Sequence, residues 1–204
     1  MKIYIKSSKQ FDRSEFNRRQ LHEIDSGLAE EFINPEINWR TMRALRENWD
    51  KFDDYQKMQI LEGLENDIEV SEYADPKFDE EQMAQIRWGL EAGLDIGLDI
   101  SQYADPRFNW MQMEQIREGL EGKVDISWYA DPKFNVAQME QIRLGLGQGL
   151  DVTQYADPKF DWKQMKQIRE GLEEQLDVSQ YADPKLHYWQ MREIRKELQG
   201  NNFS

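Results

Sequence analysis

The amino-acid sequence predicts an all-α fold, an α-solenoid of 26-residue units that each contain a long helix and a short helix, behind a short non-repetitive N-terminal segment. The first observation is the repeat itself, because self-similarity at a fixed period of about 20 to 50 residues is typical of stacked supersecondary units. The second is a helix-start signal in each unit, and the third is an apolar stripe at helical spacing behind it. The repeat is marked by Tyr-Ala-Asp-Pro, 26 residues apart, at Tyr103, Tyr129, Tyr155 and Tyr181.

The array follows a region that does not repeat. Residues 1–33 form an N-terminal segment in which MKIYIKSS predicts a short strand or a frayed end, followed by a helix. Residues 34–50 resemble a worn repeat helix, and we expect them to cap the array, because terminal units of solenoids are atypical. The second repeat unit is the longest, because GLDI is duplicated at residues 93–100. The array spans residues 51–204 in six units: 51–76, 77–106, 107–132, 133–158, 159–184 and 185–204.

Each unit begins with a long helix. Asn109 is followed three residues later by Gln112, a capping box in which each side chain binds the backbone amide of the other residue. Behind the box, Met113, Ile116 and Leu120 share one helical face and predict the core stripe. Other units carry the same box at Asp53–Gln56, Asp79–Gln82, Asn135–Gln138 and Asp161–Gln164, and His187 replaces the cap before Gln190.

A short second helix follows within each unit. Asp99, Asp151 and Asp177 each precede a glutamine by three residues, and aspartate at such a place caps a helix. This helix carries the tyrosine and ends before the proline, because the residue before proline disfavours helical geometry. We therefore expect each unit to run as long helix, tight link, short helix and turn.

Glycine recurs near the end of the long helix. An interior glycine costs about 1 kcal/mol relative to alanine, so each position needs a compensating reason. Either the backbone of the next helix approaches closely, or the glycine ends the helix in a left-handed cap. We favour close approach, because the apolar stripe continues beyond the glycine, and we expect the helix to stop instead at Gly93, Gly122 and Gly149. The recurring glycines are Gly63, Gly89, Gly119, Gly145 and Gly171.

Composition excludes several classes of function. Forty acidic and 26 basic residues give a formal net charge of −14, which opposes direct binding to a nucleic-acid backbone. The absence of cysteine excludes disulfides, thiolate metal sites and a cysteine nucleophile, and the two histidines are far apart in the sequence. No apolar stretch is long enough for a signal peptide or a membrane span. We expect a cytoplasmic, non-enzymatic protein without a cofactor or a metal.

Two charged columns of the repeat have structural explanations. Aspartate before proline is ordinary turn chemistry and lacks the tightly spaced oxygen ligands of a calcium loop. The arginines adjoin the core stripe, so we expect each to pair with an acidic group of a neighbouring unit rather than with nucleic acid. The aspartates are Asp75, Asp105, Asp131, Asp157 and Asp183, and the arginines are Arg87, Arg117, Arg143, Arg169 and Arg195.

Positions that differ between units are the candidates for partner recognition, because the scaffold makes the same demands in every unit. Most of them lie two, five and nine residues after the N-cap, on a face opposite the core stripe. Exposed aromatic residues among acidic ones are typical of protein-binding surfaces, and the partner we expect is another protein with a basic surface. Alternatively, these residues pack on the GLDI duplication or form an oligomer contact. The predicted partner-binding residues are Trp88, Met111, Trp128, Leu144 and Trp189.

The pattern YADPKF, then a variable trio, then QMxQIRxGL and LDVSxYA resembles an unnamed repeat of hypothetical proteins from phages, plasmids and conjugative elements of gut Firmicutes. The likeness covers residues 51–204, with departures at Lys57, Leu61 and Leu186 in the end units. It implies a protein of a mobile element, but no activity that can be assigned to particular residues.

That context raises an alternative function, an acidic nucleic-acid mimic that blocks a host defence nuclease, of the anti-restriction or anti-CRISPR type. Residues 1–20 carry six basic and two acidic groups, a charge of +4. Because the whole chain carries −14, the residues after position 20 carry −18. Such a surface suits a basic groove meant for DNA or RNA. The acidic face predicted for this function is Glu81, Glu114, Glu118 and Glu140.

Overall fold

The computed structural model describes residues 12–29, 32–96 and 98–201. This described part contains eight α-helices and no strand, and within each of two compact units helices pack on neighbouring helices in the repeat-like arrangement of an α-solenoid. The predicted all-α fold is therefore confirmed. The strand predicted in MKIYIKSS lies outside the described residues. The chain divides into two compact units, residues 1–100 and residues 101–204.

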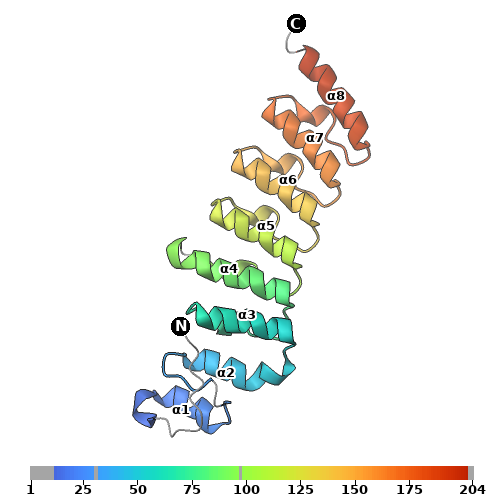
Figure 1. The fold of residues 1–204 in the computed structure, drawn as a ribbon. Coiled ribbons are helices and arrows are strands. Elements are labelled where there is room, and N and C mark those ends of the chain that lie inside the picture. The colour runs from blue at the N-terminus through green and yellow to red at the C-terminus, as the bar shows by residue number, and fades with distance from the viewer. Residues whose placement is uncertain (1–11, 30–31, 97, 202–204) are drawn as a thin grey trace. The chain divides into compact units, whose positions relative to one another are not determined.

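In residues 1–100, α1 packs on α2 and α3 packs on α4 (Figure 1). Helix α2 also lies against η4, the single helical turn that follows α3. The elements are η1 (Arg13–Glu15), α1 (Arg18–Asp25), α2 (Trp39–Asn48), η3 (Trp49–Lys51), α3 (Asp54–Glu65), η4 (Val70–Glu72) and α4 (Glu80–Ile96).

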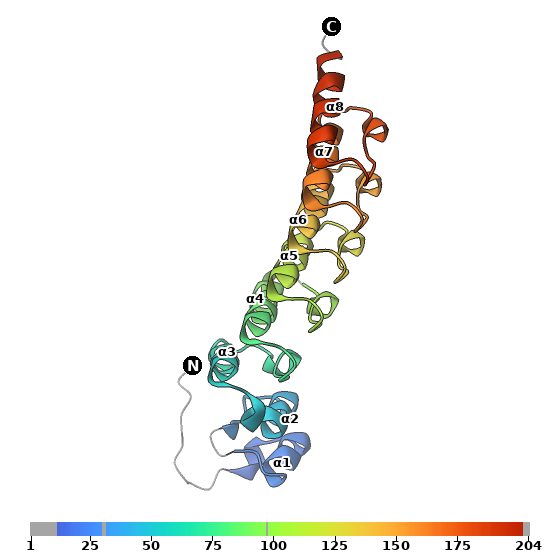
Figure 2. The same ribbon diagram turned by 90° about the vertical axis from the view of Figure 1, so that its right-hand side faces the viewer.

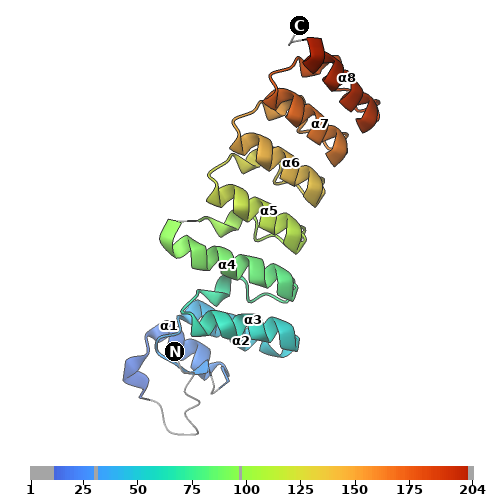
Figure 3. The ribbon, with the colours of Figure 1, turned by 45° about the horizontal axis from the view of Figure 1, so that its top comes forward.

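In residues 101–204, four long helices lie side by side (Figure 3), and the turn segments that connect them form a second layer on one side of the helices (Figure 2). Each helix packs on the next. After η5 (Ile100–Gln102) the elements are α5 (Trp110–Glu121), η6 (Ile126–Trp128), α6 (Val136–Gly147), η7 (Val152–Gln154), α7 (Trp162–Glu173), η8 (Val178–Gln180) and α8 (Tyr188–Asn201).

The capping boxes are present as predicted. In α5 the amide of Gln112 donates to Asn109 Oδ1 at 3.0 Å, and the amide of Asn109 donates to Gln112 Oε1 at 2.9 Å. In the last unit only half of the box remains, because His187 has no oxygen with which to return the bond; its own amide donates to Gln190 Oε1 at 2.8 Å. The same pairs of bonds start the helices that follow Asp53, Asp79, Asn135 and Asp161.

The capping glutamine also joins neighbouring units. Gln112 Nε2 donates to the carbonyl of Phe134 at 2.7 Å, and Gln138 Nε2 donates to the carbonyl of Phe160 at 2.6 Å. Each acceptor stands immediately before the N-cap of the next helix, so the N-terminal ends of successive helices are neighbours. Helices α5 to α8 consequently run in the same direction.

The predicted short helix is a single 3₁₀ turn. Asp125 caps η6 by accepting the amide of Ser127 at 3.1 Å, and Asp151 caps η7 by accepting the amide of Thr153 at the same distance. The tyrosine lies at the C-cap of the turn rather than inside it. Its ring fills the space between the turn and the long helix, and Tyr129 is fully buried with Met113 and Ile116.

The recurring glycine is explained by a tyrosine rather than by a neighbouring backbone. A Cβ on Gly119 would lie 1.8 Å from the hydroxyl of Tyr129, which donates to the carbonyl of Gln115 at 3.1 Å. Close approach was predicted correctly, but the approaching group is the side chain of the following turn. The same contact occurs at Gly63, Gly145 and Gly171.

The long helix does not stop at two of the three glycines predicted to end it. Lys123 adopts a left-handed φ of 56°, and Val124 N bonds to Gly119 O at 3.0 Å, the Schellman closure. Gly122 is only the C-cap, with φ −75°, and Gly93 lies inside α4, where the four duplicated residues add about one helical turn. Gly149, with φ 70°, does occupy the stop position.

The repeat extends into the region expected not to repeat. Asn17 and Gln20 form a capping box at the start of α1, and Gln20 Nε2 donates to the carbonyl of Ile37 at 2.7 Å. This bond matches the one from Gln112 to Phe134, so Asn34-Pro35-Glu36-Ile37 is a worn form of Asp-Pro-Lys-Phe. Helix α2, which was expected to cap the array, therefore packs on a further helix, α1, as well as on η4.

Candidate protein-binding surfaces

The arginine column joins helices, as predicted. Arg143 of α6 pairs with Glu118 of α5 at 2.7 Å, and its Nε donates to Gln115 Oε1 at 3.1 Å. Arg87 pairs with Glu62 at 3.0 Å in the same way, between α4 and α3. These arginines are therefore held within the scaffold.

Leu144 belongs to that junction rather than to an exposed face, which corrects the prediction. It stands where Glu118 stands in the preceding helix, and it is half-buried. Arg169 of the next helix keeps the contact with the preceding helix's glutamine, Gln141 Oε1, at 3.1 Å, and with no carboxylate at position 144 it pairs with Glu173 of its own helix and reaches Gln148 Oε1 at 3.4 Å. Leu144 thus replaces an inter-helix ion pair with an apolar residue.

The aspartate column has the predicted turn role. Asp131 accepts the backbone amide of Lys133 at 3.0 Å and faces its ammonium at 3.4 Å. The hydrogen bond from the backbone amide of Lys133 is the main cause that lowers the pKa of Asp131 below its ordinary value, and the lysine side chain lowers it further. The described residues contain no group of three or more His, Asp or Glu side chains placed to hold a metal ion.

Four of the five predicted partner-binding residues are exposed, but the structure does not gather all of them. Trp88 is 43% exposed and lies on α4, in residues 1–100. Trp128 is 40% exposed and lies on η6, in the layer of turns. Met111 and Trp189 are 40% and 52% exposed and lie at the N-terminal ends of α5 and α8. These last two share an edge.

Two further tryptophans lie on that edge and were missed in the sequence. Trp110 and Trp162 occupy the first positions of α5 and α7 and are 36% and 39% exposed. The signal was available, because the position one residue after the N-cap also varies between units, from Asp54 and Glu80 to Val136. The predicted residues came instead from the positions two and nine residues after the cap and from the turn position of Trp128.

The aromatic edge is the set Trp110, Met111, Trp162, Tyr188 and Trp189. Its members come from helices whose N-terminal ends are neighbours, and one cation links two of them: the ammonium of Lys163 lies 4.9 Å from the ring of Tyr188 and 5.5 Å from that of Trp162. Between α5 and α7, helix α6 contributes the smaller, half-buried residues Val136 and Ala137. The edge therefore presents apolar surface over four consecutive helices.

The residues predicted to form an acidic face are less continuous. Glu81 and Glu140 are exposed, Glu114 is half-buried, and Glu118 is engaged by Arg143. The position of Glu114 and Glu140 is held in α7 and α8 by basic residues, Lys166 and Arg192. The charge along this column therefore changes sign.

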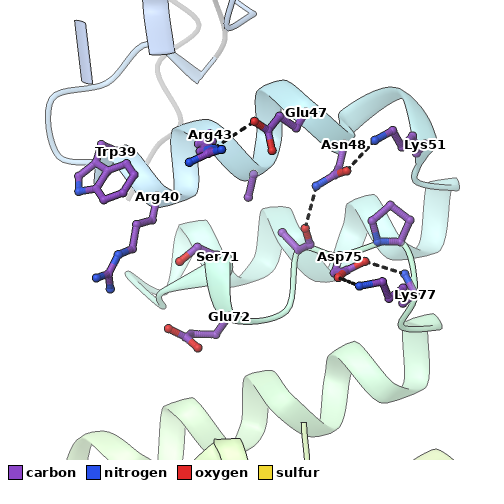
Figure 4. Close-up of a pocket in the computed structure, with 13 residues that line it drawn as sticks. Trp39, Arg40, Arg43, Glu47, Asn48, Lys51, Ser71, Glu72, Asp75 and Lys77 are labelled. Carbon is purple, nitrogen blue, oxygen red and sulfur yellow. Dashed lines mark hydrogen bonds and ion pairs between the residues drawn. The ribbon is translucent and has the colours of Figure 1, made fainter. Parts of the chain in front are cut away.

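A groove of about 750 Å³ lies between α2 and the segment that runs from η4 to α4 (Figure 4). Trp39 and Arg40 stand at one end, and Lys51 and Lys77 stand at the other. Nothing in the repeat predicted this groove, because it depends on α2 lying along a turn segment that follows α3.

Comparison with models of known protein families, with curated proteins and with solved structures finds no match to this chain. Within the helices that the structure describes, none is both long and apolar enough to cross a membrane.

Proposed function

We propose that this chain is a non-enzymatic helical-repeat module that binds another protein through the aromatic edge of residues 101–204. The observation that carries the proposal is the exposure of Trp110, Met111, Trp162 and Trp189 on one edge. Tryptophan is the residue most often responsible for a large share of binding energy at protein interfaces, since it buries a large apolar area with few rotatable bonds.

The repeated polar residues support a binding role rather than a catalytic one. Aspartate and glutamine cap helices, aspartate closes turns, and arginine and glutamate join neighbouring helices. A catalytic site needs a group placed for chemistry in one location, whereas these groups each have a structural partner that explains them. Recognition then falls to the side chains that differ between units.

The partner we propose is a protein with a basic surface, in the cytoplasm and in the setting of a mobile element. The net charge of −14 favours association with a basic protein by long-range attraction. The resemblance to repeats of phages, plasmids and conjugative elements provides the setting.

Affinity capture from the encoding organism tests the proposal. We replace Trp110 and Trp162 with valine and Trp189 with alanine, the residues that α6 carries at the same positions, so that the scaffold is preserved. The matched control is Trp128→Gln, which removes an equally exposed tryptophan and installs the residue of Gln154 and Gln180. The edge variant is expected to lose a protein that the wild type and the control both retain. Equal capture by all three, or loss in the control alone, would place the site elsewhere.

Salt dependence separates this function from the acidic mimic. Salt slows association with a basic partner by screening the long-range attraction, but contacts made by the apolar edge persist, whereas competition for a basic nucleic-acid groove weakens steeply as salt is added. If substitution of Glu81, Glu114, Glu118 and Glu140 by glutamine abolishes capture at low salt while the edge variant retains it, the acidic mimic is the correct function.

A further inference from the structure

We propose that the groove along α2 binds an acidic segment of a partner protein in an extended conformation. The groove lies within residues 1–100, so this second binding surface does not depend on the aromatic edge. Four features of the described residues support it: the shape of the groove, its unpaired cations, their separation and the small residues between them.

The shape follows from two contacts that hold α2 and the turn segment together at their ends. At one end, Thr41 Oγ1 and Asn38 Nδ2 donate to the carboxylate of Glu69, the former at 2.8 Å. At the other end, Asn48 Nδ2 lies 3.5 Å from the carbonyl of Ala74. The lining between these contacts includes small residues, Ala44 on α2 and Ser71 and Ala74 on the turn segment. The small side chains leave an elongated recess instead of a packed interface.

The lining carries more cations than its own carboxylates satisfy. Arg43 pairs with Glu47 at 3.0 Å and Lys77 pairs with Asp75 at 3.1 Å. Arg40 and Lys51 are exposed and form no ion pair with any described residue, although Lys51 Nζ donates to Asn48 Oδ1 at 2.9 Å. Against the one further carboxylate of the lining, that of Glu72, these two cations give the groove a small positive excess in a chain with a net charge of −14. They favour a ligand that carries carboxylates.

Arg40 is held in place by an aromatic ring. Its guanidinium lies 5.7 Å from the centre of the Trp39 ring, and the guanidinium of Arg19 lies 4.9 Å from the same ring. Stacking of this kind restricts a long side chain without neutralising it. The cation at this end of the groove is therefore positioned but still free to bind an anion.

The separation of Arg40 and Lys51 determines the spacing of the ligand's charges. Arg40 and Lys51 are eleven residues apart along α2 and η3, which corresponds to roughly 16 to 18 Å at the rise of α- and 3₁₀-helices. An extended chain advances about 3.3 Å per residue. The matching peptide therefore has two carboxylates about five residues apart, with small or apolar residues between them over Ala44 and Ala74.

A nucleic acid fits the same groove less well. A phosphate backbone needs cations along its whole length, whereas the lining of this groove also carries Glu47 and Glu72. The charge of the remaining chain also repels a polyanion more strongly than a peptide with two carboxylates.

The test uses the full chain, immobilised, and a pool of random heptapeptides with uncharged flanks, read out by sequencing the retained peptides. We expect enrichment of peptides with two carboxylates four to six positions apart, and about tenfold weaker binding of the same peptides with glutamine in place of glutamate. No enrichment of acidic over neutral peptides would overturn the proposal. Displacement of the peptides by a single-stranded oligonucleotide that binds more tightly would also overturn it, in favour of nucleic acid.

Three variants locate the binding. Arg40→Glu with Lys51→Glu should lose the acidic peptides and enrich basic peptides at the same spacing, and retention of the acidic peptides would contradict the site. Ala44→Phe fills the groove without changing its charge, so this variant should bind neither acidic nor basic peptides. Circular dichroism verifies that its helicity is unchanged. Lys185→Glu, an exposed cation in residues 101–204, should behave as wild type. The aromatic-edge variant should also retain the peptides, so the failure of one proposal is distinguishable from the failure of the other.

Discussion

At the scale of single residues, the repeat is organised around a tyrosine that is both buried and hydrogen-bonded. Tyr155 is fully buried, and its hydroxyl donates to the carbonyl of Gln141 at 3.2 Å. A buried hydroxyl without a partner costs free energy, so the tyrosine needs this carbonyl. Reaching the carbonyl brings the hydroxyl to the place where a Cβ of Gly145 would stand. Glycine and tyrosine are therefore a coupled pair.

We predict that Gly145→Ala lowers the free energy of unfolding by about 1–3 kcal/mol, although alanine is the better helix former, because its Cβ would lie 1.9 Å from the hydroxyl of Tyr155. In a Tyr155→Phe background the cost should be smaller, since the nearest remaining atoms, the ring Cζ and a Val152 methyl, are 3.2 and 3.3 Å away and need to move by only a few tenths of an ångström. A double-mutant cycle by urea unfolding measures the coupling. Additive effects of the two substitutions would show that the contact is not the reason for the glycine.

Burial of the tyrosines also predicts a dependence of stability on pH. Burial raises the pKa of Tyr181 to about 12 and moves those of Tyr73, Tyr103, Tyr129 and Tyr155 further above their ordinary value of 10.0. The unfolded chain releases these protons near pH 10, before the folded chain does. The contribution of the neutral, buried tyrosines to the free energy of unfolding is therefore fully present below about pH 10, and it is lost as pH rises through the folded pKa values. Urea midpoints from pH 8 to 12 measure this, and a constant midpoint across that range would be inconsistent with buried phenols.

At the scale of the element, the long helices α3, α5, α6 and α7 each end at a left-handed residue that is not always glycine. Asp67, Lys123 and Gln175 adopt φ of 57°, 56° and 57° at the position that Gly149 occupies with φ 70°. A non-glycine residue in this conformation carries a penalty of about 1 kcal/mol or more. The array accepts that penalty because the Schellman bonds and the apolar residue that follows close the helix.

Two glycines of α6 should therefore respond in opposite directions. Gly149→Ala is expected to destabilise the protein by about 1 kcal/mol, because alanine disfavours positive φ. Gly147→Ala is the matched control: this glycine ends the helix in open space, and alanine should stabilise by up to about 1 kcal/mol. Changes of the same sign in thermal or urea unfolding would contradict the assigned helix stop. Lys123→Gly should raise the free energy of unfolding, because glycine adopts the positive φ of this position without a steric penalty.

At the scale of the whole molecule, the sequence predicted the features that depend on residues close together along the chain. Capping boxes, turns and the stripe of Met113 and Ile116 are local patterns, and the structure confirms them. The tyrosine–glycine contact was predicted only in part, because a glycine signals close approach but does not name the approaching group. Leu144 was expected on an exposed face, although its column forms the junction between helices.

The two surfaces proposed for binding were less accessible to prediction. Trp110 and Trp162 were visible as variation in a column, but their gathering on an edge depends on the parallel order of the helices. The groove along α2 depends on the contact of Glu69 with Asn38 and Thr41, between residues far apart in the sequence. Contacts of this kind have no periodic signature.

We propose that this protein recognises its partner at positions where the repeat fails to repeat, above all at the aromatic edge. The most direct test is the dissociation constant of the captured protein for the wild type, for Trp162→Val and for Trp128→Gln. Because an interface tryptophan contributes about 2 kcal/mol or more, we predict a dissociation constant at least about tenfold higher for Trp162→Val and within about twofold of wild type for Trp128→Gln. An unchanged constant for Trp162→Val, with the helical spectrum intact, would contradict the account.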